Sequence, residues 1–243
     1  MAKVTLENLN KIFVSKIGKD VKAVNDFNLL LENGEILALL GSSGCGKTTT
    51  LRMIAGFETA TSGQIKIGER IVNDLKPADR NVAMAFEGYA LYPPLTVKDN
   101  IAFSLMREKI SKDKVDSKVM EVAELLEITD ILERYPPSIS GGQQQRVSLA
   151  RALVRDSDAL LLDEPMSQLE PQLRAVLRAR VKDYIQHNNK TVIFVTHDQT
   201  EAVALADKIA VMENGDLKQL ASPYEISAKP SNAVSYTHLR AHE

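Results

Sequence analysis

The chain has very little cysteine, no tryptophan and no long hydrophobic run. Its one cysteine, Cys45, cannot form an intramolecular disulfide, so the composition fits a reducing compartment. The longest apolar stretches, such as Ile36–Leu40 and Ala159–Leu162, are far shorter than the roughly 20 residues that a membrane-spanning helix needs. The first residues also lack the apolar core of a signal peptide. A role at a membrane would therefore require docking onto a membrane partner.

An excess of either charge is missing as well. The chain contains 30 Lys and Arg against 32 Asp and Glu, which gives a formal net charge of −2. Domains that bind nucleic acid usually carry a basic surplus, so we expect no nucleic-acid partner. With 243 residues, 44% of them hydrophobic, the chain is long enough for one large domain or for two joined subdomains.

Short apolar runs alternate with stretches of helical periodicity, which is typical of an α/β domain with a parallel sheet. Ile36–Leu40, Ala159–Leu162 and Val192–Val195 are predicted to be buried central strands, because both of their faces are apolar. Turn dipeptides between apolar runs also predict three antiparallel hairpins. These turns are Asn33-Gly34, Gly68-Glu69 and Asn214-Gly215. An antiparallel β layer is therefore expected beside the parallel core.

The middle of the chain predicts a helical subdomain, inserted from Tyr89 to about Asp156. Apolar residues recur there at spacings of three and four, as in the segment 119–126. A further amphipathic helix is expected over Leu173–Ile185, whose apolar residues are Leu173, Val176, Leu177, Val181, Tyr184 and Ile185. We assign residues 1–232 to one domain. Residues 233–243 carry two of the four histidines and no apolar period, so we interpret them as a non-native tail.

One segment matches the phosphate-binding pattern G-x-x-x-x-G-K-[ST] in full. Its residues are Gly41, Ser42, Ser43, Gly44, Cys45, Gly46, Lys47 and Thr48, and Thr49 follows. The glycines allow backbone amides to converge on phosphate oxygens at the start of a helix expected over Lys47–Ala55. Lys47 is expected to neutralise the β- and γ-phosphates, and Thr48 to offer its hydroxyl to Mg²⁺. A glycine-rich turn that binds nothing is the alternative, and the complete match between a strand and a helix favours phosphate binding.

Two acids end the apolar run Ala159–Leu162. Asp163 is expected to hold the Mg²⁺ ion, and Glu164 to polarise an attacking water. Strands often end in an acid that merely caps the next element, so the pattern is weak by itself. Beside a complete phosphate loop, the functional interpretation is preferred.

Ser140, Gly141, Gly142 and Gln143 precede a helix predicted over Gln144–Leu153. A serine and two glycines at a helix N-terminus form a second anion-binding concavity. The alternative is an N-cap serine with a flexible lead-in. Two phosphate sites in one chain suggest that ATP is held between two chains.

His197 follows the apolar strand Val192–Val195 and precedes Asp198. A lone histidine after a strand is more often structural than catalytic. Its place beyond a strand end, where ligands bind in open α/β sheets, favours a catalytic role.

These elements, in this order, resemble the ATP-binding subunit of ABC transporters. The Walker A loop is GSSGCGKTT, the signature is ISGGQQQR, Walker B is ALLLDEP, and the H-loop is VTHDQ. The segments FETATSGQIKIGER, YALYPPLTV, THDQTEA and LADKIAVMENG are similar to the maltose and glycerol-phosphate importer ATPases. The resemblance covers roughly Lys3 to Asn232. It implies a P-loop NTPase core with an antiparallel β subdomain and an inserted helical subdomain.

The resemblance also implies an ATP- and Mg²⁺-dependent hydrolase that works as a head-to-tail dimer. Lys47 and Thr48 of one subunit would face Ser140–Gln143 of the other, and His197 would contact the γ-phosphate. Phe13 stands where the family stacks an aromatic ring on adenine, although an ordinary core residue remains the alternative. Transmembrane permease subunits would dock near Tyr89–Leu95 and hold the protein on the cytoplasmic face of the membrane. A carbohydrate, polyol or glycerol-phosphate-like solute would be imported.

The sequence departs from the family pattern in three places. Glu87 replaces a glutamine that belongs near the γ-phosphate and the metal, and Glu170 replaces the aspartate that ends an S-x-L-D loop at the dimer interface. We therefore hypothesise that this chain pairs with a different ATPase subunit. Two alternatives stay open: the chain forms a homodimer, or it is the catalytically weak subunit of a heterodimer. The regulatory β domain usual in maltose-type importers is expected to be absent, because the match ends near Asn232.

Overall fold

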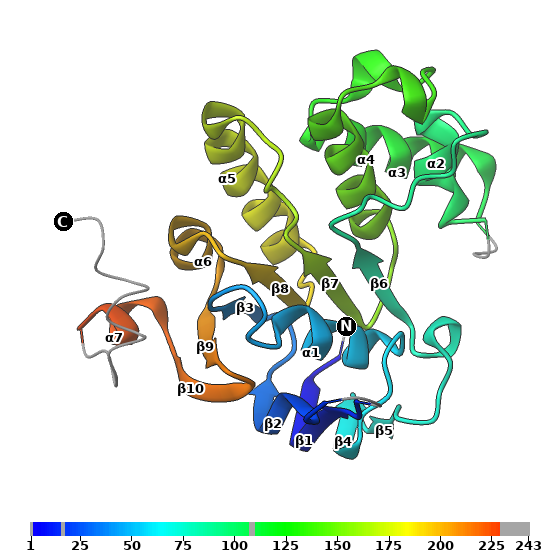
Figure 1. Ribbon diagram of the computed structural model, residues 1–243. Coiled ribbons are helices and arrows are strands. Elements are labelled where there is room, and N and C mark those ends of the chain that lie inside the picture. The colour runs from blue at the N-terminus through cyan, green and yellow to red at the C-terminus, as the bar shows by residue number, and fades with distance from the viewer. Residues whose placement is uncertain (1, 16–17, 107–109, 229–243) are drawn as a thin grey trace.

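The computed structural model describes residues 2–15, 18–106 and 110–228 of the chain (Figure 1). The tail predicted at 233–243 lies outside the described residues. One half of the molecule is built on the parallel strands β3 (Ile36–Leu40), β6 (Val82–Ala85), β7 (Ala159–Asp163), β8 (Val192–Thr196) and β9 (Lys208–Glu213). The other half contains β1 (Val4–Phe13), β2 (Val21–Leu31), β4 (Ser62–Ile67), β5 (Arg70–Ile71) and β10 (Asp216–Ala221).

Among the described residues the strands form one mixed sheet. Its order is β5-β4-β1-β2-β10-β9-β3-β8-β7-β6. Neighbours are antiparallel from β5 to β2 and between β10 and β9, and one residue pair, Asp216 with Asn25, joins β10 to β2 in parallel. The expected parallel core with an adjoining antiparallel layer is therefore confirmed.

Strand β3 divides the hydrophobic core in two. Ile36, Ala38 and Leu40 face one cluster, whereas Leu37 and Leu39 face the other, because alternate residues of a strand point to opposite faces. The first cluster is covered by α2 (Val97–Phe103), α3 (Lys112–Leu125), α4 (Gly141–Leu153), α5 (Pro171–His187), α6 (Gln199–Leu205) and α7 (Pro223–Ala228). The second is covered by α1 (Lys47–Ala55) and the strands of the antiparallel layer. The three predicted central strands are accordingly buried along their whole length.

Helices α2, α3 and α4 come between β6 and β7 in the chain and gather in one part of the molecule (Figure 1). This segment corresponds to the predicted helical insertion; its boundaries at 89 and 156 stay a prediction. The helix predicted over Leu173–Ile185 is α5, in which Leu177, Val181 and Ile185 are buried. Val176, assigned to the same apolar face, is instead exposed.

Two of the three predicted hairpins are confirmed and one is wrong. β4 pairs with β5 around Gly68-Glu69, and β9 pairs with β10 around Asn214-Gly215. Asn33-Gly34 does lie in a turn, in which Glu35 N–H donates to the carbonyl of Glu32 at 3.2 Å. The strands on either side do not pair, because both edges of β3 are taken by the parallel neighbours β8 and β9.

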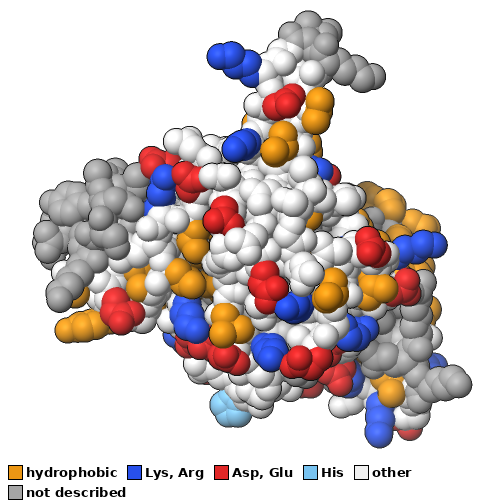
Figure 2. All heavy atoms as spheres, turned by 90° about the horizontal axis from the view of Figure 1, so that it is seen from below, with side chains coloured by type: hydrophobic (Ala, Val, Ile, Leu, Met, Phe, Trp, Pro, Cys, Tyr) orange, Lys and Arg blue, Asp and Glu red, His pale blue; other side chains and the backbone are white. Residues whose placement is uncertain are grey.

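The described part of the chain contains no helix long and apolar enough to cross a membrane. The face seen in Figure 2 carries basic and acidic side chains interspersed with single hydrophobic ones. Lys66 and Glu7 form an ion pair within the antiparallel layer at 2.7 Å, and Arg70 of β5 pairs with Asp158, just before β7, at 3.2 Å.

Candidate functional site

The loop between β3 and α1 carries the predicted phosphate-binding residues. Gly46 immediately precedes α1 and has φ +106°, and a Cβ built on it would lie 2.2 Å from the carbonyl oxygen of Ala23. Only glycine fits there, because of both the backbone conformation and the space. The loop therefore presents its amides at the N-terminus of α1, where the helix dipole favours an anion.

Lys47 is the buried cation of this loop. Its Nζ donates to the carbonyl oxygens of Gly41 and Ser42, each at 2.8 Å, and lies 3.7 Å from Sγ of the buried Cys45. A buried ammonium needs such partners, because loss of hydration is costly. Ser42, Ser43 and Gly44, by contrast, are exposed on the outer side of the loop.

Thr48, in the first turn of α1, contacts Asp163 at the end of β7. The Thr48 hydroxyl donates to Oδ1 of Asp163 at 3.0 Å. Burial raises the pKa of Asp163, with the negative charges of Glu87 and Glu164 adding to the effect, while the Thr48 hydrogen bond and Arg52 oppose it. The Thr48 hydroxyl and the buried Asp163 carboxylate supply two oxygen atoms, and further carboxylates lie close by. A hard divalent cation binds oxygen atoms and would offset this negative charge, so the oxygen pair fits Mg²⁺.

Glu164 and His197 lie together at the ends of β7 and β8. Nδ1 of His197 is 3.0 Å from Oε2 of Glu164, and the His197 side chain is 65% exposed. Glu164 itself has φ +47°, a left-handed conformation that costs a non-glycine residue about 1–2 kcal/mol. Its N–H donates to the carbonyl of Val195 at 3.0 Å, which ties the strained residue to β8.

One cavity of about 390 Å³ brings most of these residues together. Its lining consists of Ser43, Gly44, Gly46, Lys47, Thr48, Thr49, Glu87, Glu164 and His197. Glu87 is an exposed residue of the loop after β6 and contributes a carboxylate to the wall. The cavity thus combines the N-terminus of α1 and Lys47 with two carboxylates, Glu87 and Glu164, and the imidazole of His197.

The segment Ser140–Gln143 does not line this cavity. It forms the N-terminus of α4, where Gln143 N–H donates to Oγ of Ser140 at 3.3 Å and Ser140 N–H donates to Oε1 of Gln143 at 2.9 Å. This reciprocal arrangement is a capping box. Ser140 and Gly141 are nevertheless exposed, so the start of α4 stands open at the surface.

Phe13 lies at the end of β1 and does not line the cavity. Its ring is 42% exposed, with Nζ of Lys11 lying 4.7 Å from the ring centroid. Phe13 is therefore not a core residue, and the ammonium of Lys11 lies over one face of its ring in a cation–π contact.

Arg174, in the first turn of α5, is a site residue that sequence reasoning missed. Its guanidinium donates to Oδ2 of Asp198 at 3.3 Å and to the carbonyls of Ser167 and Leu169 at 3.2 and 2.9 Å. It therefore holds the loop after Glu164 against the loop that carries His197. No motif marks such a residue, because two of its partners are backbone carbonyls and the third, Asp198, is brought near by the fold.

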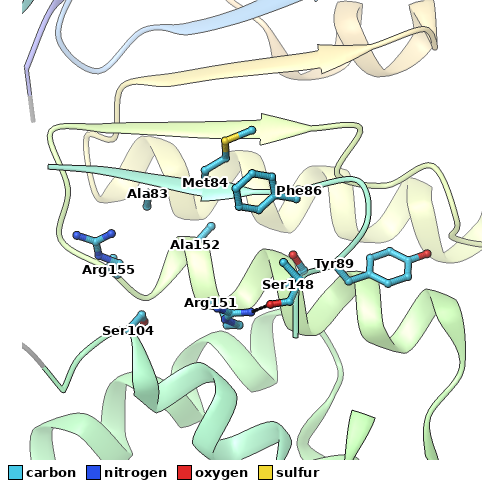
Figure 3. A pocket seen from close by; sticks show the side chains of 10 residues that line it. Ala83, Met84, Phe86, Tyr89, Ser104, Ser148, Arg151, Ala152 and Arg155 are labelled. Carbon is cyan, nitrogen blue, oxygen red and sulfur yellow. Dashed lines mark hydrogen bonds between the residues drawn. The ribbon is translucent and has the colours of Figure 1, made fainter. Parts of the chain in front are cut away.

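A second hollow lies beside α4 and is seen close by in Figure 3. Phe86 and Tyr89 line it from the loop after β6, and Arg151 lines it from α4, with Nη1 donating to the carbonyl of Ala90 at 2.6 Å. A neighbouring cavity of about 390 Å³ shares Arg151 and is lined by Tyr92, Phe103 and Met106. Tyr92 and Phe103 contact each other, their ring centroids 4.7 Å apart.

Comparison with known proteins gives consistent matches. Residues 24–167 match the family model described as ABC transporter. The chain is 48% identical over 238 residues to the trehalose/maltose import ATP-binding protein of Thermococcus litoralis, covering 96% of this chain and 63% of that protein. It is 42% identical over 239 residues to the sn-glycerol-3-phosphate import ATP-binding protein of Brucella abortus, covering 98% and 67% of the two chains. The chain thus spans about two thirds of the length of these relatives.

A solved structure also matches the fold. It is the dimeric post-hydrolysis state of an ATP-binding cassette bound to ADP and phosphate. The TM-score is 0.83 at 27% identity, covering 90% of this chain and 98% of that one.

Proposed function

Because the chain belongs to the ABC transporter family, we propose that it is the ATP-binding and ATP-hydrolysing subunit of an importer. The observation that carries the proposal is the single cavity that joins the phosphate loop, with Lys47, to Glu164 and His197. The solute would be a carbohydrate, polyol or glycerol-phosphate-like molecule, as the names of the two importer relatives suggest.

Within this cavity the residues divide the work of ATP hydrolysis. Lys47 and the loop amides bind the phosphates, and Thr48 with Asp163 would hold Mg²⁺, which supplies positive charge that stabilises the phosphoryl oxygens. Glu164 accepts a proton from the attacking water, whose oxygen bonds to the γ-phosphorus as the bond to the ADP oxygen breaks. His197, 3.0 Å from that carboxylate, orients it and stabilises charge at the γ-phosphate.

A second ATPase subunit would complete the site. Ser140–Gln143 forms an exposed helix N-terminus that faces no phosphate loop of its own chain. Such a terminus binds anions through free amides and the helix dipole. In a head-to-tail dimer it would cover the ATP held by the partner subunit.

The permease would dock at the two hollows beside α4. Tyr92, Phe103 and Met106 are exposed there, next to the buried part of Arg151. A helix from the permease would cover this apolar surface, and the protein would be held at the inner face of the membrane through that contact.

The test compares MgATP turnover and ATP affinity in the wild type, Glu164→Gln and Lys47→Ala. Glu164→Gln should bind ATP with normal affinity and lose at least about 100-fold in kcat, because it lacks the proton acceptor. Lys47→Ala should lose ATP affinity. Equal turnover by wild type and Glu164→Gln would refute the role of Glu164, and unchanged binding by Lys47→Ala would refute the phosphate site.

A further inference from the structure

Gln145 is a buried polar side chain that the mechanism above does not use. It lies in the second turn of α4 and is only 3% exposed. Its Nε2 donates to the carbonyl oxygen of Glu164 at 2.9 Å and to Oγ of Ser167 at 3.1 Å. Its Oε1 accepts from the N–H of Gln168 at 2.9 Å. These three hydrogen bonds all go to the segment that begins with Glu164.

We propose that Gln145 is a positioning residue that fixes Glu164 for proton transfer and links it to the N-terminus of α4, the end that would face the ATP of the partner subunit. The inference rests on the proposed function, because Glu164 is the proton acceptor only if the chain hydrolyses ATP.

The backbone of Glu164 needs such a clamp. A glutamate with a left-handed backbone conformation persists only where neighbouring groups hold it in place. The N–H of Glu164 is held by Val195 of β8, and its carbonyl is held by Gln145 and, at 3.3 Å, by the hydroxyl of Ser167. The N–H of Ser167 also donates to the Glu164 carbonyl, at 3.4 Å. Because Gln145 also bonds the Ser167 hydroxyl, its loss would weaken two of these three contacts.

The same glutamine joins two ends of the proposed site. Gln145 is two residues beyond Gln143, and both belong to the first turns of α4. The N-terminus of α4 also packs on the clamped loop directly, because a Cβ built on Gly142 would lie 3.2 Å from the carbonyl oxygen of Gln168. A displacement of Ser140–Gln143 by the partner's ATP would therefore move the backbone of Glu164 in the same subunit.

The chain offers a matched control in Gln144, the residue before Gln145 in the same helix. Nε2 of Gln144 donates to the carbonyls of Pro136 and Ile139 at 3.0 and 3.2 Å, and both of these carbonyls lie in the segment before α4. Gln144→Met and Gln145→Met remove the same amide from the same helix, so any effect on α4 stability is common to both.

The experiment measures ATP Kd, steady-state kcat and KM, Tm, and hydrogen exchange of the segment 163–169 in the full chain. Gln145→Met should keep ATP Kd within about threefold of wild type and lower kcat by about tenfold or more, because a small misplacement of a catalytic group is costly. Exchange in the segment 163–169 should become faster. Gln144→Met should show a comparable change in Tm with kcat within about threefold and unchanged exchange there.

Equal kcat losses in the two variants, or unchanged exchange in Gln145→Met, would overturn the proposal. A Gln145→Met protein that fails to fold is replaced by Gln145→Glu, which keeps the acceptor for Gln168 N–H and loses the donor to Glu164; it should still lower kcat. If the wild type does not hydrolyse ATP although exchange in the segment 163–169 quickens in Gln145→Met, the proposed function fails while the clamp stands.

Discussion

Asp163 is a carboxylate whose burial destabilises the folded protein unless a cation lies beside it. It is buried at the end of β7, near Glu87 and Glu164, with the Thr48 hydroxyl as its close donor. Burial raises the pKa of Asp163 above its ordinary value of 3.8, so the ionised form is less favourable in the folded protein than in the unfolded chain. Binding a cation at Thr48 and Asp163 would remove this penalty.

We therefore expect Asp163→Asn to raise Tm by a few degrees at neutral pH without Mg²⁺. Because the folded pKa is raised, the penalty is absent below the unfolded pKa and grows as pH rises through the folded pKa. The Tm advantage of the Asp163→Asn variant over the wild type, measured from roughly pH 4 to pH 8, should therefore increase with pH and then level off. A constant difference across this range, or a lower Tm, would contradict the expectation. Added Mg²⁺ should stabilise only the wild type in the presence of ATP.

Helix α1, whose N-terminus faces the proposed phosphate site, is held at its other end by one buried arginine. Arg80 is 3% exposed, and its guanidinium donates to the carbonyls of Met53 and Ile54 in the last turn of α1, at 2.7 and 3.0 Å. It also donates to the carbonyls of Leu75 and Asn73, at 2.9 and 3.0 Å. A cation at a helix C-terminus complements the dipole, and here it donates to two carbonyls of the last turn, of which that of Met53 also accepts from the N–H of Gly56 at 3.2 Å.

Arg80→Met should accordingly destabilise the protein by on the order of 3 kcal/mol, because two buried and two partly buried hydrogen bonds to carbonyls lose their charged donor. For a chain of this size that corresponds to a fall in Tm of roughly 6–12 °C. Arg80→Lys should recover part of the loss, since a point charge cannot reach all four carbonyls. Thermal unfolding is the measurement, and the control is Arg180→Met, whose 2.8 Å ion pair with Glu127 is exposed. Equal effects of Arg80→Met and Arg180→Met would refute the role of Arg80.

The molecule as a whole presents two half-sites. The cavity with Lys47 and Glu164 opens on one part of the surface, and the exposed N-terminus of α4 stands elsewhere. A closed two-subunit assembly would place each half-site against the other, consistent with the dimeric cassette that the fold matches. Glu87 would then add one negative charge beside each set of phosphates, and this departure, together with Glu170, underlies our hypothesis of a non-identical partner.

In the Glu164→Gln background, MgATP should drive little homodimer formation if this hypothesis holds. Glu87→Gln added to that background should increase the dimer fraction, because it removes a like charge near the phosphates at each site. Light scattering after gel filtration, with and without MgATP, measures the dimer fraction. Complete homodimerisation with Glu87 intact would contradict the hypothesis of a different partner subunit.

Much of the fold could be predicted because its signals are local. Ile36–Leu40 is apolar on both faces, which indicates a central strand whatever its neighbours are. The hairpin at Asn33-Gly34 could not be judged in this way, because a turn dipeptide says where the chain bends and not which strand pairs with which. Val176 likewise fits the apolar period of its helix in the sequence but is 46% exposed in the fold.

Residue order alone predicts the phosphate loop, the two acids at the end of β7 and the serine-glycine start of α4, because each prediction depends on neighbouring residues in one segment. Only the folded chain shows that Thr48 meets Asp163, that His197 reaches Glu164, and that Gln145 and Arg174 clamp the loop between them. Hydrogen bonds between distant segments, many of them to backbone carbonyls, leave no pattern of residue types along the chain. They arise only when parallel strands bring their carboxyl ends to one edge of the sheet.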